Sequence, residues 1–137
     1  MLKNKKRKVI VSTLILGLIL SISAIGLAYS KGYSFNIRSS VTGSYKFNLN
    51  NKSTTITANA DTINVRTGRT LSDKHQYTVY LEKNWSFESR DTGQLTTGSR
   101  YTKNVGKVSG GDYRIKVIKH TYSDYGINIK GGGNVIQ

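Results

Sequence analysis

Cysteine and proline are both absent from this chain of 137 residues, and acidic residues are scarce, with seven against 21 lysines and arginines. Without cysteine the protein has no disulfide, no thiol nucleophile, no cysteine to carry a lipid and no thiolate ligand for zinc. The two histidines, His75 and His120, lie far apart in the sequence and form no ligand motif. We therefore predict a disulfide-free protein without a bound metal or cofactor.

The first 28 residues have the pattern of an export signal. Residues 1–8 carry five cations and no acid, and residues 9–28 are twenty uncharged residues rich in Leu, Ile and Val. Gly26 and Ala28 fit a signal-peptidase site, which predicts cleavage after Ala28. Twenty residues also reach about 30 Å as a helix, so an uncleaved membrane anchor is the alternative. Both interpretations place one domain, residues 29–137, outside the cell, and a secreted domain without disulfides is typical of bacteria.

Apolar and polar residues alternate with period two along residues 29–137, which predicts β-strands. The apolar sets that share a face are Tyr33, Phe35 and Ile37; Tyr45, Phe47 and Leu49; Ile56 and Ala58; Ile63 and Val65; Tyr77, Val79 and Leu81; Tyr113, Ile115 and Val117; and Tyr125, Ile127 and Ile129. No stretch shows a helical stripe. We predict an all-β, antiparallel β-sandwich of about seven to nine strands behind the signal helix, with a small β-barrel as second choice.

Glycine-containing segments separate these strands and predict turns, among them residues 109–112 and the three consecutive glycines Gly131, Gly132 and Gly133. Residues 33–38 and 125–130 also match in residue type at nearly every position. This similarity suggests that the first and last strands pair.

No motif for catalysis is present, and we predict that the protein is not an enzyme. No serine lies in the context of a hydrolytic triad, and we expect His75 and His120 to have structural or surface roles. Glu82 and Glu88 flank a predicted hairpin around Trp85, and a small wall hydrolase would need two such carboxyl groups in one cleft. A surface ion pair between Glu82 and a lysine is the simpler interpretation.

The strongest functional signal is positive charge. Without the five signal cations, 16 basic and seven acidic side chains remain, a net charge of +9 that lies in residues 29–70 and 100–137. Strand parity places Lys46, Arg114 and Lys116 opposite apolar faces, and pairing of the first and last strands would give one sheet a basic face. The predicted anion-binding residues are Arg38, Lys46, Arg114, Lys116, Lys119 and Lys130.

Aromatic residues provide a second possible contact, since exposed Trp and Tyr stack on sugars or lie at membrane interfaces. The candidates are Trp85, Tyr80 and Tyr122. The sequence thus predicts a secreted, non-enzymatic protein that associates with anionic polymers of the bacterial cell envelope or matrix. A cationic antimicrobial or toxin-like protein acting on anionic membranes is the alternative, and no sequence-specific nucleic-acid binding is expected.

Overall fold

The computed structural model describes residues 28–121 and 125–137. The predicted signal segment therefore lies outside the described residues except for Ala28, as does Tyr122. Within the described ranges, no helix is long and apolar enough to cross a membrane.

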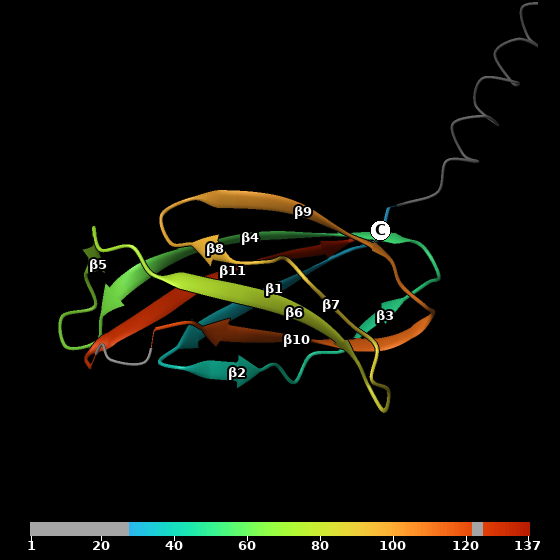
Figure 1. Cartoon of the computed structure of the whole chain (residues 1–137), viewed down its shortest axis with the longest axis horizontal. Coiled ribbons are helices and arrows are strands. Elements are labelled where there is room, and N and C mark those ends of the chain that lie inside the picture. Colours follow the sequence, from blue (N-terminus) through green and yellow to red (C-terminus); the bar gives the residue numbers. More distant parts are fainter. Residues whose placement is uncertain (1–27, 122–124) are drawn as a thin grey trace, which may run out of the picture.

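The described part of the chain contains eleven strands, and the long ones run along the long axis of the molecule (Figure 1). Six are long: β1 (Ser30–Ile37), β4 (Ser53–Asn64), β6 (Gln76–Lys83), β9 (Arg100–Lys107), β10 (Gly111–Lys119) and β11 (Ile127–Ile136). Five have two or three residues: β2 (Ser40–Thr42), β3 (Phe47–Leu49), β5 (Thr70–Leu71), β7 (Ser89–Asp91) and β8 (Leu95–Thr96). These short edge strands explain why the count exceeds the predicted seven to nine.

Two antiparallel sheets contain all of these strands, and they do not join into a closed barrel. Sheet A has the order β1–β11–β4, with β5 and β9 both paired to the far edge of β4. Sheet B has β10 and β6 at its centre, with β2 and β3 on one side and β7 and β8 on the other. The first and last strands do pair, from Ser30 opposite Ile136 to Ile37 opposite Ile129.

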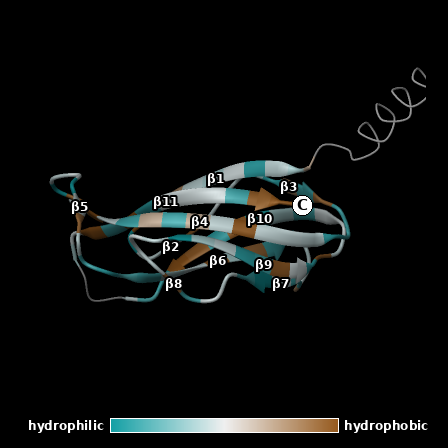
Figure 2. Ribbon diagram, turned by 90° about the horizontal axis from the view of Figure 1, so that it is seen from above, coloured by the Kyte–Doolittle hydropathy of each residue, from teal (hydrophilic) through white to brown (hydrophobic). Residues whose placement is uncertain are grey.

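One hydrophobic core is built from the inner faces of both sheets, which gives a sandwich-like arrangement. The rings of Tyr33 and Phe35 in β1 stack with 6.3 Å between their centroids, and the ring centroids of Phe35 and Tyr77 in β6 lie 5.8 Å apart. Hydrophilic and near-neutral stretches alternate with short hydrophobic ones along the strands (Figure 2). The predicted inner faces of β1, β6 and β10 are confirmed, since all nine of their apolar residues are buried.

Three predicted inner residues are wrong, because they lie beyond strand ends. Tyr45 is 66% exposed and precedes β3, whereas Tyr125 is 86% exposed and precedes β11. Val65 is also exposed, because the two short strands predicted around Ile56 and Ile63 are a single strand, β4. Its inner face continues in phase from Ile56 through Ala60 to Thr62, and this phase leaves Ile63 on the other face.

The predicted turn at Gly131–Gly133 is also wrong, since all three glycines lie inside β11 between β1 and β4. The backbones approach so closely that a side chain does not fit. A Cβ on Gly131 would lie 2.0 Å from the Asn59 carbonyl oxygen, and one on Gly133 would lie 1.8 Å from that of Thr57. These glycines therefore permit close strand contact rather than chain reversal.

Candidate functional site

The outer face of sheet B brings together four of the predicted contact residues. Because Tyr113, Ile115 and Val117 of β10 are buried, the alternate residues Arg114 and Lys116 point away from the core. Arg114 lies opposite Glu82 of β6, and Lys116 lies opposite Tyr80. Side chains directly opposite each other in an antiparallel pair share a face, so two cations, a carboxylate and a phenol form one patch. Trp85 follows in the turn after β6.

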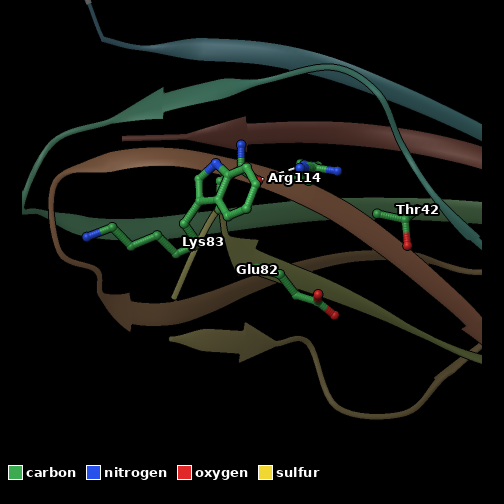
Figure 3. Close-up of a pocket in the computed structure, with 6 residues that line it drawn as sticks. Thr42, Glu82, Lys83 and Arg114 are labelled. Carbon is green, nitrogen blue, oxygen red and sulfur yellow. Dashed lines mark hydrogen bonds between the residues drawn. The ribbon is translucent and has the colours of Figure 1, made fainter. Parts of the chain in front are cut away.

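A hollow of about 230 Å³ lies in this patch, and we call it the sheet B hollow. Its lining residues are Thr42, Glu82, Lys83, Asn84, Trp85 and Arg114 (Figure 3). The Lys83 side chain extends away from Glu82 and Thr42, and its Nζ donates to Ser109 Oγ at 2.8 Å. The polar groups that face a ligand therefore come from three elements: β2, β10, and the end of β6 with its turn.

Arg114 is oriented for binding an anion. Its Nε donates a hydrogen bond of 2.7 Å to Asn84 Oδ1, which fixes the plane of the guanidinium group. Among the described residues, no group bonds to its two terminal nitrogens. Guanidinium groups with two parallel N–H donors bind carboxylate and phosphate in bidentate geometry. Arg114 can therefore hold an oxyanion without breaking an existing ion pair.

Trp85 occupies an unusual position in the hairpin between β6 and β7. Its side chain is fully exposed, and its φ of 59° lies in the left-handed region that bulky residues avoid. Such a conformation costs of order 1 kcal/mol and is often found at functional sites. An indole held in this way offers a flat apolar surface for stacking on a sugar ring.

Lys116 and Glu82 form a surface ion pair, with 3.7 Å between Nζ and Oε1. This is the pairing of Glu82 with a lysine that the sequence suggested. Exposed ion pairs contribute at most about 1 kcal/mol, so an anionic ligand can compete for the lysine.

The remaining predicted cations are distributed over other parts of the molecule. Lys46 is exposed in the loop before β3, outside the strands, and its carbonyl oxygen accepts a hydrogen bond from Lys31 Nζ of β1. Lys130 lies on sheet A, and Arg38 lies just after β1 with its guanidinium 5.8 Å from the ring of Tyr125. The predicted cations are thus divided between the two sheets, because β1 and β11 pair in sheet A whereas Arg114 and Lys116 belong to sheet B.

Lys119 is a further correction, because its side chain is only 1% exposed and cannot be part of a surface patch. It follows Tyr113, Ile115 and Val117 in phase and therefore points inward. Its Nζ donates to the Ile127 carbonyl oxygen at 3.5 Å.

Glu82 and Glu88 do not form a pair of facing carboxylates. Glu82 lines the sheet B hollow, whereas Glu88 accepts a hydrogen bond of 3.0 Å from the Ser109 backbone N–H and a second from the Ser109 hydroxyl. The side-chain hydrogen bond from Ser109, followed by the backbone one, holds the pKa of Glu88 below its ordinary range. Glu88 is thus an ionised structural group that fixes the loop before β10 to the hairpin.

The two histidines have structural contacts. His120 Nε2 lies 2.7 Å from Thr78 Oγ1, and the backbone N–H of His75, a buried residue, donates to Thr97 Oγ1 at 3.0 Å. Within the described ranges, no group of three or more His, Cys, Asp or Glu side chains could hold a metal ion.

Phe87 is not among the predicted contact residues, although its side chain is fully exposed two residues after Trp85. The signal was available, because two large aromatic residues in a polar turn have no strand face on which to be buried. Asn84 was also missed, since its role of orienting Arg114 depends on the three-dimensional contact.

Comparisons with known proteins identify no relative. No protein-family model and no curated protein matches the chain. A chain of the acidic stable capsid structure of Helicobacter pylori bacteriophage KHP30 is similar over 81% of this chain and 94% of its own length. The identity is 8% and the TM-score 0.28, values too low to support any argument about fold or function.

Proposed function

We propose that the protein is a secreted, non-enzymatic factor that binds anionic, sugar-containing polymers of the bacterial cell surface or matrix through the sheet B hollow. The observation that carries this proposal is the combination of an exposed Trp85 and an oriented Arg114 in one hollow. A sugar ring stacks on the indole, while phosphate or carboxylate meets the guanidinium.

The neighbouring residues support the same ligand class. The Glu82 carboxylate can accept hydrogen bonds from hydroxyl groups, and the Asn84 amide can donate hydrogen bonds to them. Thr42 adds a hydroxyl on the opposite side of the hollow. Lys116 adds positive charge on the same face, so binding releases counterions and weakens with salt. Secretion rests on the signal pattern of residues 1–28.

The test is co-sedimentation of the purified protein with Gram-positive cell walls, with and without their phosphate polymers, over a salt titration. We expect binding that requires the polymers and decreases with salt. Arg114→Gln should weaken it about tenfold, which corresponds to about 1.4 kcal/mol. The control is Arg66→Gln, which removes the same charge from an exposed turn and should change binding less than twofold.

Equal losses in the two variants would mean that only net charge is sensed, and they would refute the site. No binding at low salt would refute the function.

A second candidate function is binding to anionic membranes, which the exposed pair of Trp85 and Phe87 favours. The hairpin that carries them projects from the end of the molecule where β3 lies (Figure 1). Phe87 does not line the sheet B hollow. Phe87→Ala should therefore reduce binding to anionic vesicles while leaving wall binding intact, and leakage of such vesicles measures the antimicrobial alternative directly.

A further inference from the structure

The ladder between β4 and β11 is interrupted at one point in sheet A. The register runs from Ile127 to Gly132 and resumes at Val135, so Gly133 and Asn134 have no paired residue in β4. The Asn134 backbone N–H instead donates to Thr57 Oγ1 at 2.9 Å, and the Thr57 carbonyl oxygen accepts from the Tyr33 hydroxyl at 2.7 Å. The hydrogen bonding between β4 and β11 is therefore irregular beside the three glycines, while the register stays the same on both sides.

A hollow of about 370 Å³ lies on the outer face of sheet A beside this irregularity, and we call it the sheet A hollow. It is lined by Thr57, Ala58, Asn59, Arg100, Thr102, Gly133 and Asn134. Asn59 lies opposite Arg100 in β9 and opposite Gly132 in β11, so these residues share the outer face. Gly132 adds no side chain, and its missing Cβ would lie 2.3 Å from the Tyr33 carbonyl oxygen.

The polar groups around this hollow have few partners. No hydrogen bond or ion pair with another described residue engages the side chains of Asn59, Arg100, Thr102 or Asn134. Two amides, a hydroxyl group and one guanidinium thus surround a hollow that Gly133 also lines. Amide and hydroxyl groups suit the hydroxyls of a saccharide, and a free guanidinium suits a carboxylate or phosphate on it.

We propose that the sheet A hollow is a second binding site, independent of the sheet B hollow, for an acidic saccharide whose anionic group meets Arg100. Asn59 and Asn134 bind the hydroxyls of the sugar unit that lies over Gly132. The lining residues disfavour other ligand classes. No aromatic ring is present for a nucleobase to stack on, and Ala58 is the only apolar side chain for a peptide or lipid among the described lining residues.

The experiment is an NMR titration of the purified protein with three oligosaccharides: neutral maltohexaose, oligogalacturonate with carboxylates, and phosphorylated maltohexaose with phosphates. We expect one or both acidic oligomers to shift the backbone amides of Gly132, Gly133 and Asn134, and maltohexaose to bind at least tenfold more weakly. The comparison of carboxylate with phosphate identifies the anionic group.

Variants separate the two sites. Arg100→Gln should weaken the effect at Gly132–Asn134 at least tenfold, whereas Arg114→Gln and the charge-matched control Arg69→Gln should leave it unchanged. All three residues are exposed, so their variants should keep the thermal midpoint of the parent. Equal weakening by Arg69→Gln, shifts confined to residues of the sheet B hollow, or no shifts with any oligomer would overturn the proposal. Failure of wall binding alone would not affect it.

Discussion

Replacing tyrosine by phenylalanine should have opposite effects on the free energy of unfolding at Tyr33 and at Tyr77. Both side chains are buried, and the ring of Phe35 contacts both of theirs. The Tyr33 hydroxyl donates to the Thr57 carbonyl oxygen at 2.7 Å, whereas the Tyr77 hydroxyl is buried and has no hydrogen-bond partner among the described residues. Replacing each tyrosine by phenylalanine removes only the hydroxyl, so the difference between the variants measures the hydrogen bond.

The magnitudes follow from the cost of an unpaired polar group. A buried hydroxyl without a partner costs about 1–3 kcal/mol, whereas a satisfied one contributes about 1 kcal/mol net. Tyr77→Phe should therefore raise the free energy of unfolding by about 1–2 kcal/mol, and Tyr33→Phe should lower it by about 1 kcal/mol. For a domain of about 100 residues, each kcal/mol shifts the Tm by roughly 4–6 °C.

Urea unfolding followed by far-UV circular dichroism is the suitable assay, because the single tryptophan is fully exposed and reports poorly on the core. The two variants should move the unfolding midpoint in opposite directions. A decrease of similar size in both would show that the Tyr77 hydroxyl has a partner, such as a buried water, and the reasoning would be refuted.

The same tyrosines predict loss of stability at alkaline pH. Burial removes water from both phenols and raises the pKa of each well above its ordinary value near 10. The folded state therefore keeps these protons while the unfolded state loses them above pH 10, so the contribution of the two tyrosines to stability is constant below pH 10 and falls above it. The slope is up to about 1.4 kcal/mol per pH unit for each tyrosine. Tyr77→Phe should reduce the loss in unfolding free energy between pH 9 and pH 11, and an unchanged loss would contradict the assignment.

Three further predictions concern β11, the hairpin and β10. Gly131→Ala should lower the free energy of unfolding by more than about 2 kcal/mol, because the new Cβ would lie 2.0 Å from the nearest atom. Gly43→Ala should change it by less than about 0.5 kcal/mol, because there the distance is 3.4 Å. Similar urea midpoints for these two would contradict the close approach of β11 and β4. Trp85→Asn should raise the free energy of unfolding by about 0.5–1 kcal/mol, since asparagine tolerates a positive φ. The same variant should weaken wall binding. Undiminished co-sedimentation with cell walls would exclude the indole from the site. Lys116→Gln should flatten the salt dependence of wall binding, whereas Lys119→Met should not, and equal effects would mean that Lys119 reaches the surface.

The periodicity of the sequence predicted the long strands and their inner faces, because a strand that is buried on one side has an apolar residue at every second position. Tyr113, Ile115 and Val117 illustrate this in β10. The same period placed Lys119 inward, and its predicted surface role ignored that parity. The rule fails where the strand has already ended, as at Tyr45 and Tyr125, and inside β4 at Ile63.

Tertiary contacts determine what periodicity cannot predict in β4. Its inner face ends on Thr62, a polar residue, whereas the alternation of apolar residues predicted that Ile63 points inward. Thr62 is buried because its hydroxyl donates to the Asp73 carbonyl oxygen at 2.7 Å and lies 2.9 Å from Thr97 Oγ1. Both partners are distant in sequence, so only the folded chain shows that this threonine is satisfied.

In the candidate sites, too, strand periodicity predicted some residues and tertiary contacts determined the others. Strand parity and the composition of the β6–β7 turn were enough to place Arg114, Lys116 and Trp85 on an outer face, but the sheet B hollow depends on Asn84 and Thr42, which have no sequence signature. The sheet A hollow was missed because glycine has two opposite structural uses. Three consecutive glycines predict a turn when the chain reverses, and they permit close approach when a strand runs between two others. In β11 the second use applies, because the backbones of β1 and β4 occupy the space that side chains at Gly132 and Gly133 would need, and Gly133 lines the sheet A hollow beside Asn134.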